Sequence, residues 1–138
     1  MNAEIENLIS DFELIDDWED RYRHLIELGR ALPDMDQALK TPSTKVNGCA
    51  SQVWTHSRVE GNGLEKRLAL QGDSDALIVK GLIAVVFKLF APLSVSEIIS
   101  ADALAVFARL GLKDHLTPQR SNGLASMVAR IKADAAAA

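Results

Sequence analysis

The sequence predicts an α+β fold, in which several helices pack against a small antiparallel sheet. Three observations lead to this prediction. Apolar residues recur at helical spacing near both ends of the chain, the middle carries a strand–turn–strand pattern, and helix-capping pairs divide the second half into segments. The 138 residues are 48% hydrophobic and 25% charged, which is enough to bury one core without disulfides or metal. We therefore expect residues 1–138 to form a single domain.

Two amphipathic helices are predicted in the N-terminal third. The first covers Ala3–Glu13, because its apolar residues fall on one stripe: Ile5, Leu8, Ile9 and Phe12. The second begins at Asp16, which forms a capping-box-like pair with Glu19. It ends before Pro33, since the residue preceding a proline is displaced from helical angles.

A β-hairpin is predicted in the middle of the chain. Lys45 and Val46 form a short strand that leads toward it. The first arm covers Gln52–Glu60, a three-residue turn follows at Gly61–Gly63, and Leu64–Gln71 returns. Gly72 is expected to end the second arm. Alternation in the first arm does not decide which of its faces is buried.

A long apolar helix, Asp75–Phe90, is predicted to be the centre of the core, with Asp73 or Ser74 as its cap. Gly81 within it would allow another element to approach closely. Three further helices follow from their capping signals: Ser94 paired with Glu97, the segment Asp102–Leu110 before Gly111, and Thr117 followed by Pro118.

Charge and hydropathy exclude several classes of function. The net charge of −4 and the pI of about 5.3 argue against general nucleic-acid binding, which usually requires a basic face. The first twelve residues are acidic where a signal peptide needs a basic start, and the longest apolar run, Gly81–Phe87, is too short to span a membrane. A single cysteine also suits a reducing compartment. We expect a cytoplasmic protein.

Cys49 is the most informative residue because it is the only cysteine in the chain. It cannot close an internal disulfide, and it lacks the other ligands that a zinc or iron–sulfur site needs. A lone cysteine often fills space in a core as a small hydrophobic residue. Its context also suits a nucleophile or group acceptor: Gly48 permits a tight turn before it, and Ser51 and Gln52 supply polar groups after it.

Three sequence blocks resemble the SufE-like sulfur-acceptor family. The blocks occur in family order: Val46-x-Gly48-Cys49-x-Ser51-Gln52-Val53-Trp54, Leu70-Gln71-Gly72-Asp73-Ser74-Asp75-Ala76-x-Ile78-Val79-Lys80-Gly81-Leu82, and His115-Leu116-Thr117-Pro118-x-Arg120-Ser121-x-Gly123-Leu124. The resemblance as a whole covers nearly the whole chain. The resemblance implies a SufE/IscU-like α+β fold. It also implies that Cys49 accepts sulfur as a persulfide from a cysteine desulfurase of SufS or CsdA type and stimulates that enzyme. The sulfur would pass to an iron–sulfur scaffold or another recipient, and pyridoxal phosphate would be bound by the desulfurase, not by this chain.

Two residues of the third block are candidates to support Cys49. His115 is the histidine best placed to act as a general base in a cysteine hydrolase, and a structural role in the turn before a helix is the alternative. Arg120 falls in the first turn of a predicted helix, where the helix dipole disfavours a cation. This position suggests a partner near the cysteine loop, either a carboxylate or a backbone carbonyl. A solvated arginine is the alternative.

Four other functions are alternatives to sulfur transfer, and they differ in what they require of the lone cysteine. A cluster scaffold needs more thiolates than the chain has. A thiol peroxidase would turn over peroxide, a thiol hydrolase would work without a partner protein, and a pure binding module would not need Cys49. A persulfide carrier must in addition keep its sulfur sheltered until the partner docks, and Gly48 and Ala50 are small enough to let the loop move.

Overall fold

The structure is a computed structural model that describes residues 3–48 and 51–138, apart from the side chains of residues 113 and 114. Its elements follow in this order: α1 (Ala3–Glu13), α2 (Trp18–Ala31), the 3₁₀ turn η1 (Gln37–Leu39), β1 (Val53–Glu60), the 3₁₀ turn η2 (Gly63–Glu65), β2 (Arg67–Ser74), α3 (Leu77–Phe90), α4 (Val95–Ser100), α5 (Ala103–Arg109), α6 (Leu112–His115) and α7 (Pro118–Ala137). The predicted α+β class with a small antiparallel sheet is confirmed.

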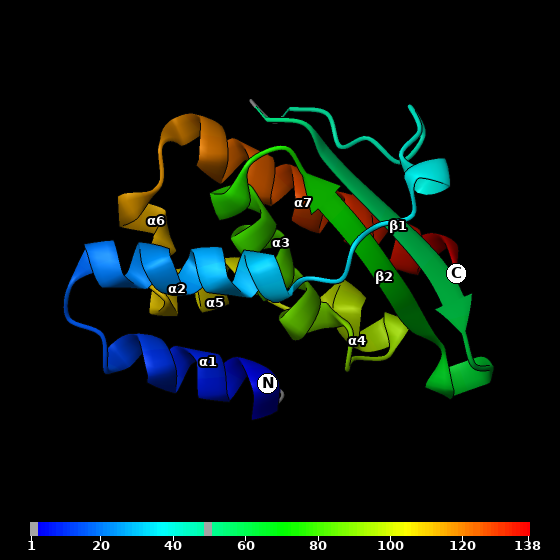
Figure 1. The fold of residues 1–138 in the computed structure, drawn as a ribbon. Helices are drawn as coiled ribbons and strands as arrows, with labels where there is room; N and C mark the ends of the chain where they lie inside the picture. Colours follow the sequence, from blue (N-terminus) through cyan, green and yellow to red (C-terminus); the bar gives the residue numbers. More distant parts are fainter. Residues whose placement is uncertain (1–2, 49–50) are drawn as a thin grey trace.

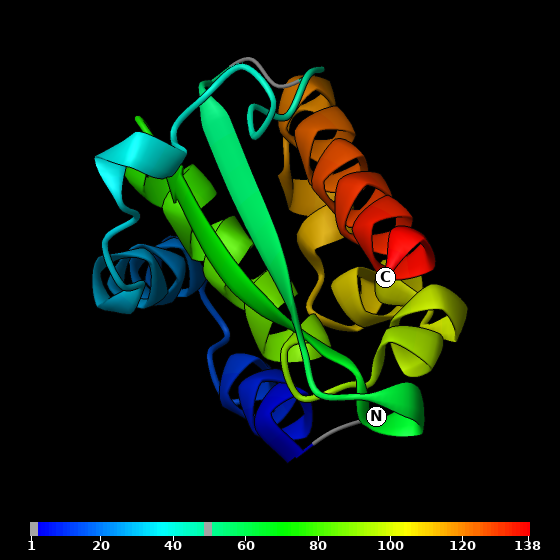
Figure 2. The same ribbon diagram turned by 90° about the vertical axis from the view of Figure 1, so that its right-hand side faces the viewer.

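The hairpin β1–β2 lies on one side of the molecule, and α1 and α2 lie on the other (Figure 1). Helix α3 runs between them, in contact with both α2 and β2. Figure 2 shows the C-terminal helix α7 alongside the hairpin. Because α3 is enclosed by these layers, ten of its fourteen residues are buried, as expected for the central helix of the core.

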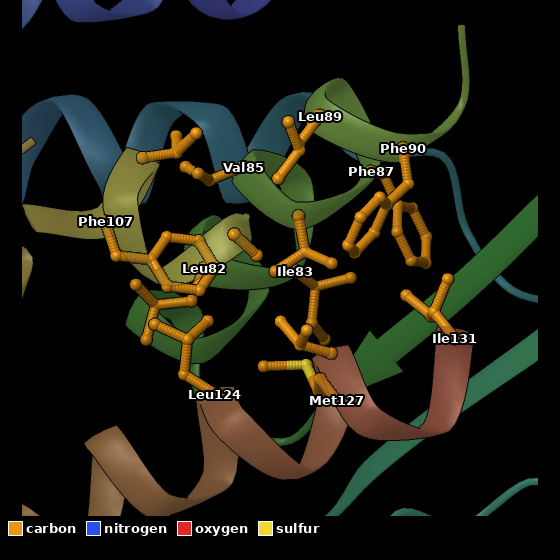
Figure 3. Close-up of a cluster of buried hydrophobic side chains, with 14 of the residues drawn as sticks. Leu82, Ile83, Val85, Phe87, Leu89, Phe90, Phe107, Leu124, Met127 and Ile131 are labelled. Carbon is orange, nitrogen blue, oxygen red and sulfur yellow. The ribbon is translucent and has the colours of Figure 1, made fainter. Parts of the chain in front are cut away.

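Side chains from α3, α5 and α7 meet in this core (Figure 3). Leu82, Phe107 and Leu124 are each at most 4% exposed and come from the three different helices. The predicted apolar stripe of α1 is also buried. Burying a large aliphatic or aromatic side chain stabilises the fold by about 1.5–3 kcal/mol. These residues are therefore the main source of stability.

Helices α2 and α3 approach each other at two glycines. A Cβ at Gly81 would lie 2.1 Å from the carbonyl oxygen of Leu25, and a Cβ at Gly29 would lie 2.8 Å from the nitrogen of Gly81. Neither position has room for a side chain. The close approach expected at Gly81 is confirmed, and Gly29 is its counterpart on α2.

The hairpin differs from its prediction at both ends of β2. Residues 61–66, including the turn η2, connect the strands, so the return strand starts at Arg67 and not at Leu64. It also continues past Gly72 to Ser74, which pairs with Val53. Gly72 does not end the strand because it is buried against Phe87 on α3, where a side chain would not fit.

The predicted cap of α3 is therefore also wrong. Asp73 and Ser74 are strand residues, and the N-cap is Ala76, which has no side-chain cap. On α2 the cap is Asp17, one residue later than predicted, and its carboxylate accepts a hydrogen bond from the N–H of Glu19. The capping box of Ser94 with Glu97 is confirmed. Asp102, predicted as the first residue of the next helix, is the N-cap of α5.

The start of α7 is as predicted. Thr117 is the N-cap and its hydroxyl accepts from the N–H of Arg120, while Pro118 occupies the first turn. The short helix α6 between Gly111 and Thr117 was not predicted. Gly111 takes a left-handed φ of 74° against the ring of Trp18, and this conformation both ends α5 and begins α6.

Candidate functional site

Cys49 and Ala50 lie outside the described residues. The residues on either side, Gly48 and Ser51, are described. Gly48 lies against Ser126 in the N-terminal half of α7, and Ser51 lines the pocket beside that helix. The site is therefore built from the two ends of the cysteine segment, the start of α7 and the adjoining ends of β1 and α3.

The segment before Cys49 is held against β1. The N–H of Val46 donates to the carbonyl of Val53 at 2.8 Å, and the N–H of Thr55 donates to the carbonyl of Thr44 at 2.9 Å. Lys45 forms an isolated antiparallel bridge with Trp54. The short strand expected at Lys45–Val46 is thus present as a single bridge with flanking hydrogen bonds, and it directs the chain toward α7.

Gly48 needs to be a glycine for two reasons. Its φ is 88°, in the region that residues with side chains rarely adopt. A Cβ there would lie 2.9 Å from the hydroxyl oxygen of Ser126 on α7. The sequence suggested that Gly48 allows a tight turn, and the positive φ agrees with that reading. The contact with Ser126 could not be read from the sequence.

The segment after Cys49 is fixed by Asp75. A carboxylate oxygen of Asp75 accepts from the N–H of Gln52 at 3.1 Å, and the N–H of Asp75 donates to the carbonyl of Gln52 at 3.4 Å. Gln52 is therefore held in place by hydrogen bonds of its backbone, and the residue is exposed to solvent. The sequence analysis placed Asp75 at the start of the long apolar helix and missed this link.

A pocket of about 240 Å³ opens beside Ser51. Its floor is apolar and buried, and it is made by β1, α3 and α7: Val53, Val79, Leu82, Leu124 and Met127. Its rim is polar: Ser51, Thr117, Gln119 and Arg120, of which the last three are exposed. Gly123 on α7 completes the lining. The sequence predicted that the long apolar helix is the centre of the core, and it gave no sign that residues of this helix also line a pocket.

Arg120 is at the rim of this pocket and exposed. Residues 49 and 50 and the side chains of residues 113 and 114 are not described, and among the rest of residues 3–138 the structure gives the guanidinium of Arg120 no ion pair or hydrogen bond. The described residues therefore do not supply the carboxylate or carbonyl that its position in the first turn suggested. Its charge faces solvent at the mouth of a pocket whose other described lining residues are uncharged.

His115 does not line the pocket. Its ring stacks on the indole of Trp18, with ring centroids 3.7 Å apart and an angle of 14° between the planes. Its carbonyl accepts a hydrogen bond from the hydroxyl of Tyr22. These contacts join α2 to the turn before α7. His115 thus contributes to the placement of the helix that carries Arg120.

A charge cluster lies on the opposite face of the hairpin from Val53. Asp73 pairs across the strands with Trp54 and binds the ammonium groups of Lys40 at 2.6 Å and Lys80 at 3.2 Å. Burial raises the pKa of Asp73. Hydrogen bonds from Lys40, the N–H of Ser74 and Lys80 outweigh that effect and hold the pKa below its ordinary value of 3.8. The cluster links the segment that leads to the cysteine with β2 and α3.

Neither a metal cluster nor a membrane span is found in the part of the chain that the structure describes. Within it, His, Cys, Asp and Glu side chains nowhere gather in a group of three suited to a metal ion. None of its helices combines the length and the hydropathy needed to cross a bilayer.

Comparisons with known proteins identify the same family that the three sequence blocks resemble. The model of the family described as "SufE: Fe-S metabolism associated domain" matches residues 6–135. An uncharacterised SufE-like protein of Rhizobium meliloti (strain 1021) is 47% identical over 131 residues, which is 95% of this chain and 94% of the relative. Another, from Rhizobium etli, is 47% identical over 133 residues, covering 96% and 90%.

A solved structure has the same fold. The solution structure of a hypothetical protein from Thermus thermophilus superposes with a TM-score of 0.77, covering 97% of this chain and 94% of that protein. At 19% identity this likeness concerns the fold alone.

Proposed function

The chain belongs to the SufE family, and on this basis we propose that Cys49 accepts sulfur from a cysteine desulfurase and carries it as a persulfide. The observation that carries the proposal is the pocket beside Ser51. It lies next to the segment that holds the only cysteine, has an apolar floor, and has a cation, Arg120, at its rim.

The transfer is an exchange at sulfur. The thiolate of Cys49 attacks the terminal sulfur of the persulfide on the desulfurase. The sulfur–sulfur bond of the donor breaks, a new one forms on Cys49, and the donor cysteine leaves as a thiolate. One thiolate is consumed and one is produced, so the step needs neither an oxidant nor a reductant.

The pocket offers what each stage of this exchange requires. A persulfide is easily reduced by small thiols, and an apolar floor of about this size can hold one or two sulfur atoms away from solvent. The exposed guanidinium of Arg120 favours the anionic form of a nearby thiol or persulfide, because an opposite charge stabilises the charged state. Thr117 and Gln119 add polar groups at the same rim.

The segment that carries Cys49 is fixed at both ends. Val46 and Gly48 hold the upstream side against β1 and α7, and the link between Gln52 and Asp75 holds the downstream side. A short loop with fixed ends can present its side chain reproducibly to a partner. Pyridoxal phosphate belongs to the desulfurase in this proposal. The sulfur passes from Cys49 to an iron–sulfur scaffold or another recipient in the cytoplasm.

Stimulation of the desulfurase tests the proposal. The rate at which a SufS- or CsdA-type desulfurase consumes cysteine is measured with and without the protein. Wild-type protein should raise the rate, because transfer to Cys49 frees the enzyme for another turnover. Cys49→Ser should not raise it. Ser10→Ala, at an exposed serine of α1 that does not line the pocket, is the control and should retain the stimulation. Equal stimulation by wild type and Cys49→Ser would refute the proposal.

A further inference from the structure

A second, larger hollow lies on the other flank of α7. It has a volume of about 520 Å³ and is formed between α5, the turn before α7 and the first half of α7. Phe107 and Leu124 form its buried floor. Its walls are exposed apolar side chains: Leu104, Ala105, Ala108 and Ala125. We refer to this surface as the α5–α7 groove.

The chemistry of the groove favours an apolar side chain. Leu104 is 67% exposed, and covering its side chain with an apolar group of a partner would remove apolar surface from water, which is favourable. The groove has two polar lining residues, Asp102 and Ser121. The carboxylate of Asp102 is already occupied, since it accepts from the N–H of Ala105 as the cap of α5. A polar ligand would find few groups with which to bond.

The groove adjoins the pocket beside Ser51. Leu124 lines both hollows, and the groove residue Leu116 immediately precedes the pocket residue Thr117. A stable protein–protein interface covers about 800 Å² on each partner and is therefore roughly 30 Å across, whereas an α-helix with its side chains is about 10–12 Å wide. A protein that docks at the pocket therefore reaches the groove.

We propose that the α5–α7 groove is part of the docking surface for the desulfurase and receives an apolar side chain of that enzyme. The inference rests on the proposed function, because it takes the pocket beside Ser51 as the point where the partner arrives. Interfaces are commonly anchored by a few side chains that fill well-packed pockets near the centre of the interface and are surrounded by contacts of low energy. Leu104 and the alanines around it form such a pocket.

Two variants test the groove, each with a matched control. Ala125→Trp fills the groove from an exposed position of α7, and Ala129→Trp makes the same change one turn later, outside the lining residues. Leu104→Asn removes the apolar wall, and Leu14→Asn makes the same change at a leucine that is 83% exposed on another part of the molecule. All four positions are exposed, so the fold should tolerate each change.

The measurements are the Kd for a desulfurase whose catalytic cysteine is replaced, and the rate of sulfur transfer to Cys49 at saturating desulfurase. We expect Ala125→Trp and Leu104→Asn to weaken binding at least tenfold and to leave the saturated transfer rate within about twofold. Their controls should bind as the wild type does. This division between affinity and rate separates a docking role from a general loss of structure.

Three other outcomes are possible, and each would refute a specific claim. Unchanged Kd values in both groove variants, with normal sulfur transfer by the wild type, would refute the groove and leave the proposed function intact. Failure of the wild type to take up sulfur would refute the proposed function. If sedimentation of the protein alone shows a dimer that Leu104→Asn dissociates, the groove binds a second copy of the chain and the assignment to the desulfurase is wrong.

Discussion

Replacing Gly48 with alanine should destabilise the protein and impair sulfur uptake at the neighbouring Cys49. Two effects add. A side chain at a φ of 88° costs about 1–2 kcal/mol, because L-residues clash with their own backbone in this region. The new Cβ would also lie 2.9 Å from the hydroxyl oxygen of Ser126, which must turn away at a cost of about 0.5–1.5 kcal/mol. The expected total is about 1.5–3.5 kcal/mol.

Chemical denaturation separates the two effects. Gly63→Ala is the matched control, since Gly63 has a φ of 58° and a methyl group there would have no atom within 4 Å of it. It should show the backbone cost alone, about 1–2 kcal/mol. Adding Ser126→Ala to Gly48→Ala should recover the steric part, about 0.5–1.5 kcal/mol.

The same variants test the link to function. Gly48→Ala should slow sulfur transfer to Cys49, because the strained residue shifts the segment that carries the thiol. Gly63→Ala, which lies at the tip of the hairpin, should transfer sulfur normally. The reasoning is wrong if Gly48→Ala costs no more than Gly63→Ala, or if Ser126→Ala fails to recover any stability.

Three further predictions concern stability. Gly81→Ala should cost several kcal/mol by denaturation, about 3 or more, because the new Cβ would meet the carbonyl of Leu25 and two helices would have to separate. Asp73→Asn should cost about 1–3 kcal/mol at neutral pH. Because the folded pKa of Asp73 is lowered, its contribution is present above pH 3.8 and lost as the pH falls further, so wild type and variant should converge in acid. Leu82→Ala should cost about 2–5 kcal/mol, and Cys49→Ala should cost less; the reverse order would contradict the placement of the core.

The parts of the fold that follow from local signals were predictable. The stripe of α1, the capping box at Ser94, and Thr117 with Pro118 depend on residues within one or two turns of each other. The end of β2 was not predictable in this way. Asp73 resembles a helix cap locally, but Lys40 from a distant part of the chain and Lys80 on the following helix bind its carboxylate.

In the candidate site, too, the features set by local sequence were predictable and those set by distant contacts were not. The local sequence drew attention to Cys49, Gly48 and Arg120, because a lone cysteine after a glycine and a cation at a helix start are visible without a structure. The pocket was not visible. Val79 and Met127 are apolar residues within helices, and only the packing of α3, α7 and β1 leaves a hollow above them. The bond from Gln52 to Asp75 likewise joins residues 23 positions apart.

A second set of experiments addresses the shelter of the sulfur before transfer. Cys49 in the free protein should react with iodoacetamide more slowly than an unfolded cysteine peptide does, and faster when an inactive desulfurase is bound. Each tenfold gain in exposed population requires about 1.4 kcal/mol of preferential binding to the exposed state. Equal rates with and without the partner would mean that the shelter comes from the complex itself.

The central claim is that Cys49 is the sulfur acceptor, and mass spectrometry of a single transfer tests it most directly. A desulfurase is loaded with persulfide, freed of cysteine and mixed with the protein, and the intact mass is taken before and after a mild thiol reductant. The account predicts a gain of one sulfur atom that maps to the peptide containing Cys49 and disappears on reduction. A sulfur gain of the same size in Cys49→Ser, or none in the wild type with any desulfurase of SufS or CsdA type, would contradict it.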